Sequence, residues 1–290
     1  MKPAAFAYHQ PATRAEALDV LGEYGEEAKV LAGGQSLVPA MNMRFARPAR
    51  LVDVNRLDEL TLAVEGDALA VGALVRQNDV LGSALVRERV PLLAYALPFV
   101  GHWQTRSRGT LCGSLAHADP SAELPVVATA LDATIACASR GGERVLGAAQ
   151  FFVSHFTTAL APDELVVGAR FPVRQGRDGY AFDEFAERHG DFAIVSAACT
   201  LRLAKGDDTL AALRLVIGGV GEVPAVIDTT GHLGRPLDDE AVASLAARAE
   251  RDVDPFGDHR ASAAYRRHLA GVLARRVLRA AAHDVRKEDA

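Results

Sequence analysis

Two adjacent glycines, Gly33 and Gly34, break the chain directly after a short apolar run at residues 29–32. That run is typical of a buried strand, and a helical turn is expected at residues 38–44. Glycine lets the backbone come close to a ligand, and successive N–H groups in such a turn can bind an anion. We therefore predict a phosphate-binding turn, and the alternative is a plain strand-to-helix turn. The turn comprises Ala32, Gly33, Gly34, Gln35, Ser36 and Leu37.

The hydrophobic pattern predicts an α+β chain in three regions. Residues 13–24 are expected to form a helix that begins with a capping box of Thr13 and Glu16. Residues 62–64 and 68–71 flank a glycine turn and predict a hairpin. Further helices are expected at 78–86, 92–100, 238–248 and 259–283, and further strands at 51–54, 133–138, 165–169, 193–203 and 213–217. We place subdomain limits at 1–56, 57–174 and 175–290, with a linker at 172–179.

A second stretch, residues 106–120, consists of small and hydroxyl-bearing residues with few large side chains for a core. Thr110 and Ser114 supply hydroxyls, and Asp119 can bind a sugar or ribityl hydroxyl. The alternative is a polar surface loop. His117 can tether a cofactor covalently or move protons, but a lone histidine in such a segment more often makes a structural hydrogen bond.

Charge and composition exclude several other functions. Lys and Arg total 32 and Asp and Glu total 37, so the net charge is −5 and no nucleic-acid surface is indicated. No run reaches the about 18 apolar residues of a membrane span, and residues 1–10 lack the order of a signal peptide. Arginines near the C-terminus recur at helical spacing, which favours a solvated helix face over an anion site. They are Arg266, Arg267, Arg275, Arg276 and Arg279.

No metal site or hydrolytic motif emerges. Cys112, Cys137 and Cys199 stand far apart. They predict a reduced, cytoplasmic protein and are too few for an iron–sulfur cluster, which needs about four thiolates. The chain has no GxGxxG, P-loop or GxSxG, and its histidines lack metal-ligand spacing. Residues 218–221 are rich in glycine but precede no helix, so we expect a turn. We assign no catalytic residue and no metal ligand.

Taken in chain order, these segments closely resemble the medium, FAD-binding subunit of the xanthine dehydrogenase and carbon monoxide dehydrogenase family. The resemblance covers nearly the whole chain. It rests on residues 30–39, 51–55 and 108–120, and it continues in an expected strand at 188–195 and a final helix at 265–269. One departure stands out: family members usually carry two glycines where this chain has Cys112 and Gly113. A thiol therefore stands where bare backbone is expected.

The resemblance implies a fold and a cofactor. The fold would be a two-part FAD-binding domain of the p-cresol methylhydroxylase type followed by a small C-terminal α/β domain. The FAD pyrophosphate would lie along the glycine turn, with Asp119 on a sugar or ribityl hydroxyl. We expect FAD to bind non-covalently, since nothing in the sequence marks a tethering residue. Ala193 and Ile194 would approach the isoalloxazine through their backbone. The other residues of the cradle would be Thr110, Gly113, Ser114 and His117.

The same resemblance implies an electron relay. The subunit would pass electrons from a small [2Fe-2S] subunit through FAD to an external acceptor, and a large subunit would carry molybdopterin. The family's usual assembly is a dimer of heterotrimers. Two alternatives stay open: a free-standing FAD-dependent oxidoreductase of the same wider fold, and a scaffold that has lost FAD.

Overall fold

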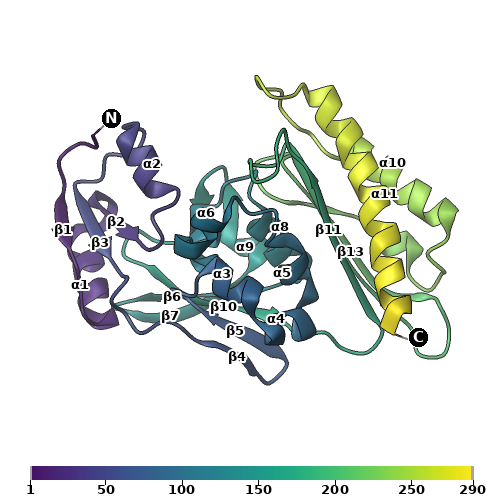
Figure 1. The fold of residues 1–290 in the computed structure, drawn as a ribbon, viewed down its shortest axis with the longest axis horizontal. Coiled ribbons are helices and arrows are strands. Elements are labelled where there is room, and N and C mark those ends of the chain that lie inside the picture. Colours follow the sequence, from purple (N-terminus) through teal and green to yellow (C-terminus); the bar gives the residue numbers. More distant parts are fainter. Residues whose placement is uncertain (1, 289–290) are drawn as a thin grey trace.

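Three β-sheets of three to five strands follow one another along the described chain, and each is covered by helices from its own part of the sequence (Figure 1). The computed structural model describes residues 2–288, so Met1, the first residue of the segment compared with a signal peptide, lies outside them. The mixture of helices and sheets confirms the predicted α+β class. None of the described helices is long and apolar enough to cross a membrane.

The first sheet is parallel, with strand order β1-β3-β2. Helix α1 (Arg14–Tyr24) packs on it and begins as predicted, because the Thr13 hydroxyl accepts the N–H of Glu16 at 3.2 Å. The Glu16 carboxylate accepts the N–H of Ala12 instead of that of Thr13. A short 3-10 helix (Gly25–Glu27) follows α1, and α2 (Leu37–Asn42) follows the glycine turn. The strands are β1 (Ala7–His9), β2 (Ala28–Leu31) and β3 (Arg50–Asp53).

The middle sheet is antiparallel, with strand order β4-β5-β10-β6-β7. It contains the predicted hairpin. Its strands are β4 (Leu62–Glu65), β5 (Ala68–Gly72), β6 (Thr134–Ser139), β7 (Gly142–Gly147) and β10 (Leu165–Pro172), and β8 (Phe152–Ser154) pairs separately with β9 (Thr157–Thr158). The helices over it are α3 (Gln77–Gly82), α4 (Ala84–Arg89), α5 (Pro91–Ala96), α6 (Trp103–Arg108), α7 (Leu111–His117), α8 (Glu123–Ala130) and α9 (Ala148–Phe151).

Two helix predictions in this part need correction. The single helix expected at 78–86 is divided at Ser83, whose hydroxyl accepts the N–H of Val86 at 3.3 Å and starts a new helix. The stretch at 106–120 is no surface loop, because it contains the end of α6 and all of α7. Helix α7 forms because Leu111, Cys112 and Leu115 share one face and are buried in the middle core.

The third sheet is antiparallel, with β11 (Asp178–Phe185), β12 (Val195–Leu203), β13 (Leu210–Gly218) and β14 (Ala225–Ile227) in that order. A 3-10 turn (Thr230–His232) follows it, and then α10 (Asp239–Asp252) and α11 (Ala263–Glu288) cover the sheet face that is turned away from the middle part (Figure 1). The strand expected at 188–195 is wrong, because residues 186–194 form a loop and β12 begins only at Val195.

Helix α8 joins the second and third parts. All eight of its residues are buried, and Val126 packs against Gly218 of β13. The linker between the two parts is shorter than predicted and runs only from 173 to 177. Arg174 connects the linker to both parts: its N–H donates to the carbonyl of Arg89 at 2.7 Å, and its guanidinium pairs with Asp284 of α11 at 2.8 Å.

Candidate functional site

The glycine turn lies directly against the second stretch of small residues. A Cβ on Gly33 would lie 2.3 Å from the carbonyl oxygen of Arg108 and 2.7 Å from the Cα of Gly109. No side chain fits at that distance, so the close approach of the two backbones requires glycine at position 33. The structure thus brings together two segments that lie far apart in the sequence.

Gly34 makes the turn itself, with a φ of 72° in the left-handed region that favours glycine. Within residues 2–288, the N–H groups of Gly34, Gln35 and Ser36 donate to no acceptor. The turn borders a cavity of about 390 Å³, together with Asn55 and Arg108. Unpaired N–H groups beside a cavity are the arrangement that binds a phosphate.

A chain of hydrogen bonds joins the first sheet to the second segment. Asn55 donates from Nδ2 to the carbonyl of Ala32 at 2.9 Å and accepts at Oδ1 from Arg76 at 2.7 Å. Arg76 also donates to the carbonyl of Arg108 at 2.7 Å. The two side chains therefore fix the spacing of the two segments. Sequence reasoning missed both: Asn55 lies within the family-like segment 51–55, whereas no local pattern marks Arg76.

Asp53 also lines this cavity. Its carboxylate accepts the Tyr8 hydroxyl and, at 2.9 Å, the N–H of Asn55. Burial opposes the charge, but these hydrogen bonds lower the pKa of Asp53, and the same contact raises the pKa of Tyr8. Asp53 is therefore ionised at neutral pH and orients Asn55.

The residues expected to complete the cradle lie on α7. Thr110 is buried, and its Oγ1 accepts the N–H of Gly113 at 3.0 Å as the N-cap of the helix. A Cβ on Gly113 would lie 2.5 Å from that oxygen, so the cap requires glycine there. Thr110 is thus a cap whose hydroxyl still has a proton to donate. Ser114 follows on the same helix and is half-buried.

Helix α7 ends at His117, and Asp119 lies just beyond it. The imidazole is half-buried, with its ring 5.1 Å from that of Phe156. Burial lowers the pKa of His117, although the nearby Asp119 charge acts in the opposite direction. The side chain is therefore neutral at pH 7. Asp119 accepts the N–H of Ser121 at 2.9 Å through Oδ1, which leaves Oδ2 for a ligand hydroxyl.

A buried carboxyl next to Asp119 was missed by sequence reasoning. Glu123, at the start of α8, is 3% exposed, and burial raises its pKa to about 7. Glu184 on β11 interacts with it, and burial raises the pKa of Glu184 to about 8. Glu184 is therefore mostly protonated near neutral pH, and Glu123 is in the middle of its titration there. In the sequence Glu123 looks like an ordinary acidic residue of a first helical turn.

Ala193 and Ile194 are buried where the loop before β12 meets the end of β13. The carbonyl oxygen of Ile194 would lie 2.5 Å from a Cβ on Gly219, which has a φ of 74°. The N–H of Gly219 in turn donates to the carbonyl of Pro120 at 3.0 Å. The third segment is therefore in contact with the turn that follows α7.

One elongated site follows from these contacts. Helix α7 has seven residues and rises about 10 Å, with the glycine turn at its start and Ile194 near its end. Of the predicted residues, those that line the 390 Å³ cavity are Ala32, Gly33, Gly34 and Gln35. Those that do not line it are Ser36, Leu37, Thr110, Gly113, Ser114, His117, Asp119, Ala193 and Ile194.

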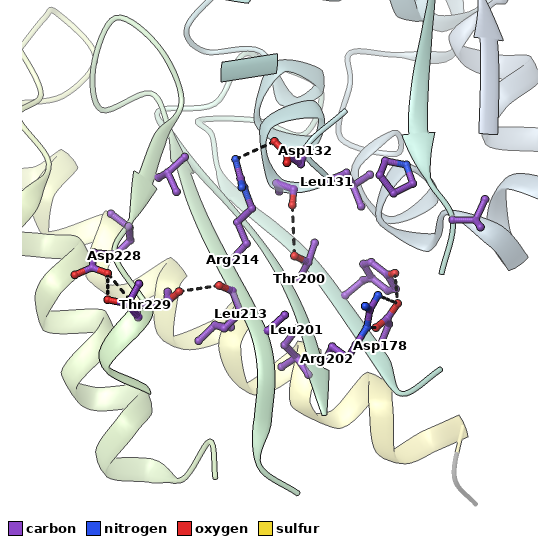
Figure 2. Close-up of a pocket in the computed structure, with 18 residues that line it drawn as sticks. Leu131, Asp132, Asp178, Thr200, Leu201, Arg202, Leu213, Arg214, Asp228 and Thr229 are labelled. Atoms are coloured by element: carbon purple, nitrogen blue, oxygen red, sulfur yellow. Dashed lines mark hydrogen bonds and ion pairs between the residues drawn. The ribbon is translucent and has the colours of Figure 1, made fainter. Parts of the chain in front are cut away.

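A larger cavity of about 690 Å³ lies elsewhere, between the middle part and the third sheet (Figure 2). Its charged side chains are all in ion pairs: Arg202 with the buried Asp178 at 2.5 Å, Arg214 with Asp132 at 3.5 Å, and Asp228 with Arg248 outside the cavity at 2.5 Å. It contains none of the predicted site residues. We therefore place the candidate site at the glycine turn and along α7.

The geometry fits FAD. A glycine turn with unpaired N–H groups accepts a pyrophosphate, and glycine at 33 and 113 keeps the cradle free of side chains. The buried Cys112 belongs to the middle core, so its thiol takes no space in the cradle. Fold and site together define a flavin-binding protein of the two-part type.

Comparisons with known proteins agree. Residues 4–174 match the family described as FAD binding domain in molybdopterin dehydrogenase, and residues 180–281 match the CO dehydrogenase flavoprotein C-terminal domain. The chain is 38% identical to subunit alpha of the 6-hydroxypseudooxynicotine dehydrogenase complex of Paenarthrobacter nicotinovorans, over 99% of this chain and 97% of that protein. It is 35% identical to the carbon monoxide dehydrogenase medium chain of Hydrogenophaga pseudoflava, over 97% and 98%.

Solved structures give the same result. The TM-score is 0.93 with carbon monoxide dehydrogenase from Hydrogenophaga pseudoflava, at 34% identity over 97% of this chain and 98% of that one. It is 0.92 with quinoline 2-oxidoreductase from Pseudomonas putida 86, at 35% identity over 98% and 99%. The chain belongs to the family of FAD-binding medium subunits of molybdenum hydroxylases. The predicted resemblance, cofactor and two-part fold are thereby confirmed.

Proposed function

We propose that the chain holds FAD non-covalently along the glycine turn and α7, and that this flavin relays electrons from an iron–sulfur subunit to an external acceptor. The observation that carries the proposal is the contact of Gly33 with the backbone of Arg108 and Gly109, beside N–H groups that have no acceptor within residues 2–288. FAD, when bound, supplies the redox chemistry, and the protein positions it and tunes its potential.

Each group of predicted residues would contact a different part of FAD. The pyrophosphate would bind to the N–H groups of Gly33, Gly34, Gln35 and Ser36, with Ala32 and Leu37 at the edges of the turn. Thr110, Gly113 and Ser114 would complete this end with a hydroxyl, an open backbone and a second hydroxyl. Asp119 would accept a ribityl or sugar hydroxyl through its free carboxylate oxygen, and His117 would lie beside it without a covalent bond. Ala193 and Ile194 would meet the isoalloxazine.

The proposed partners follow from what the chain lacks in its sequence and from the names of its relatives. Three cysteines cannot hold a cluster with about four thiolate ligands, so electrons must arrive from another chain. The relatives are called a medium chain and a subunit of a complex. We propose a small [2Fe-2S] subunit, a large molybdopterin subunit and a dimer of heterotrimers. The division at 1–56, 57–174 and 175–290 is supported by the three sheets.

We propose a cytoplasmic location, which the three buried, unpaired cysteines support. The intact glycine cradle favours FAD binding over a scaffold that has lost the cofactor. The full-length match to medium chains favours a relay subunit over a free-standing oxidoreductase.

The experiment is a reconstitution of the purified chain with FAD, assayed with and without its two partner chains against carbon monoxide, N-heteroaromatics, purines and aldehydes. We expect flavin uptake by the chain alone and substrate oxidation only by the complete complex. Oxidation by the chain alone would replace the relay with a free-standing enzyme. Failure to take up flavin, alone or in the complex, would favour the scaffold.

A further inference from the structure

Arg266 is buried where a solvated helix face was predicted. The residue is 4% exposed, whereas the neighbouring Arg267 pairs with the almost fully exposed Asp254. The prediction for this arginine is wrong because helical spacing cannot tell which side of α11 meets the sheet. A buried cation is costly unless hydrogen bonds and a counter-charge compensate it.

The Arg266 guanidinium bonds to the two backbone segments that meet at the end of the third sheet. Nη1 donates to the carbonyl of Ile194 at 2.5 Å and to that of Gly219 at 3.2 Å. Nη2 pairs with Asp258 at 2.8 Å. Its Nε is buried and has no partner among residues 2–288. The side chain therefore reaches from α11, on the outer face of the sheet, to the loop that precedes β12.

The same contacts continue into the FAD-binding part. Gly219 accepts from Arg266 through its carbonyl, and its N–H donates to the carbonyl of Pro120. Pro120 follows Asp119 directly. A single line of hydrogen bonds thus runs from α11 through Gly219 to the end of the proposed flavin site.

We propose that Arg266 is a positioning residue for the flavin: it fixes the Ile194 and Gly219 backbone against the isoalloxazine and places a positive charge, balanced by Asp258, behind that ring. This inference rests on the proposed placement of FAD. A buried charge acts over a longer range than an exposed one because water screens it less. Removing one member of the pair therefore changes the charge that the flavin experiences.

Substitutions of Arg266 and of Asp258 should shift the flavin midpoint potential in opposite directions. In the FAD-loaded complex, Arg266→Met leaves Asp258 uncompensated, so the flavin midpoint potential shifts to more negative values. Asp258→Asn leaves Arg266 uncompensated and keeps Oδ1 for the N–H groups of Arg260 and Ala261, so the potential shifts to more positive values. FAD affinity falls about tenfold in Arg266→Met, since a hydrogen bond to a charged group is lost. Arg267→Met, on the same helix, is the matched control and leaves both quantities unchanged.

A purely structural role gives a different pattern. Arg266→Met would then lower only the melting temperature of the FAD-free chain, and the two potentials would stay equal or shift in the same direction, which overturns the proposal. If Arg266→Met does not fold, Arg266→Lys replaces it. Lysine keeps the charge, so the flavin midpoint potential stays near that of the wild type while FAD affinity falls. A potential shift as large as that expected for the loss of a charge overturns the proposal.

If FAD does not bind at the proposed site, the result is different again. Gly34→Val, measured together with these variants, would then bind FAD normally, whatever flavin midpoint potentials the Arg266 and Asp258 variants have. If Gly34→Val loses FAD but the flavin midpoint potential is unchanged in Arg266→Met and Asp258→Asn, the proposed FAD site is supported and the role of Arg266 is refuted.

Discussion

The thiol of Cys112 lies 3.7 Å from the carbonyl oxygen of Val71, inside the middle sheet. The residue is 2% exposed, and burial raises the pKa of the thiol to about 12. A cysteine where the family resemblance led us to expect glycine is thus accommodated by the core, because the side chain leaves α7 on the face that packs against β5.

Cys112→Gly should leave FAD binding unchanged or tighten it, since the thiol has no part in the cradle. It should also destabilise the chain by about 2 kcal/mol, because a buried side chain is deleted and glycine weakens a helix. Flavin content and a thermal melt measure the two effects. Cys112→Ala, which keeps helix propensity, should lose less stability. A clear loss of flavin in either variant would give the thiol a role in the site.

Gly34→Val should abolish FAD binding and leave a folded chain. Valine at a φ of 72° is strained by about 1–3 kcal/mol, and its branched side chain meets Leu31 and Val38, so the N–H groups of the turn are displaced. Gly66→Val is the matched control, because Gly66 has a φ of 65° and open space around it. Flavin absorbance after gel filtration should vanish in the first variant and persist in the second. Equal flavin content in both would remove Gly34 from the site.

Acid precipitation of the holoprotein should release all the flavin into the supernatant. Among the predicted site residues, His117 is the one that could form a covalent bond to the flavin. Its imidazole, however, is neutral and half-buried beside Phe156. Flavin that stays in the pellet, and leaves it in His117→Ala, would show a covalent bond.

Glu123 should make the chain less stable as pH rises. Its folded pKa is about 7 against an ordinary value of 4.5, so between these values the unfolded chain loses a proton that the folded chain keeps. The free energy of unfolding therefore falls from about pH 4.5 to about pH 7, by roughly 3 kcal/mol at full effect. Glu123→Gln should reduce this slope, to which Glu184 also contributes, and should be the more stable protein at pH 8. Denaturant melts across this range test it, with the exposed Glu88→Gln as control. An unchanged slope in Glu123→Gln would contradict the assignment.

Local signals in the sequence predicted the two segments that the structure brings together at the proposed FAD site. Gly33 and Gly34 stand out because only a turn or a close approach needs two glycines after a strand, and the capping role of Thr13 follows from spacing alone. The same local reasoning failed at residues 106–120, because a seven-residue helix with small residues shows no clear period. It also failed for the three-residue strands β1 and β14, which are too short to show alternation.

Tertiary contacts decided the rest. Arg76 and Arg266 donate to backbone carbonyls of segments far away in sequence. No local sequence pattern near either residue predicts these hydrogen bonds. The raised pKa of Glu123 likewise comes from burial under another part of the chain. Such residues become visible only once the fold is known.

The short linker at 173–177 connects the FAD-binding part closely to the third sheet. Arg174 is held by Arg89 on one side and Asp284 on the other, and Asp284 also accepts the hydroxyl of Tyr95 at 2.8 Å. These contacts restrain the linker, so we expect both walls of the proposed flavin site to move as a single unit. For an electron carrier such rigidity would have a use: the gap across which an electron tunnels would be set once, when the subunits assemble, and thermal motion of the parts would not widen it.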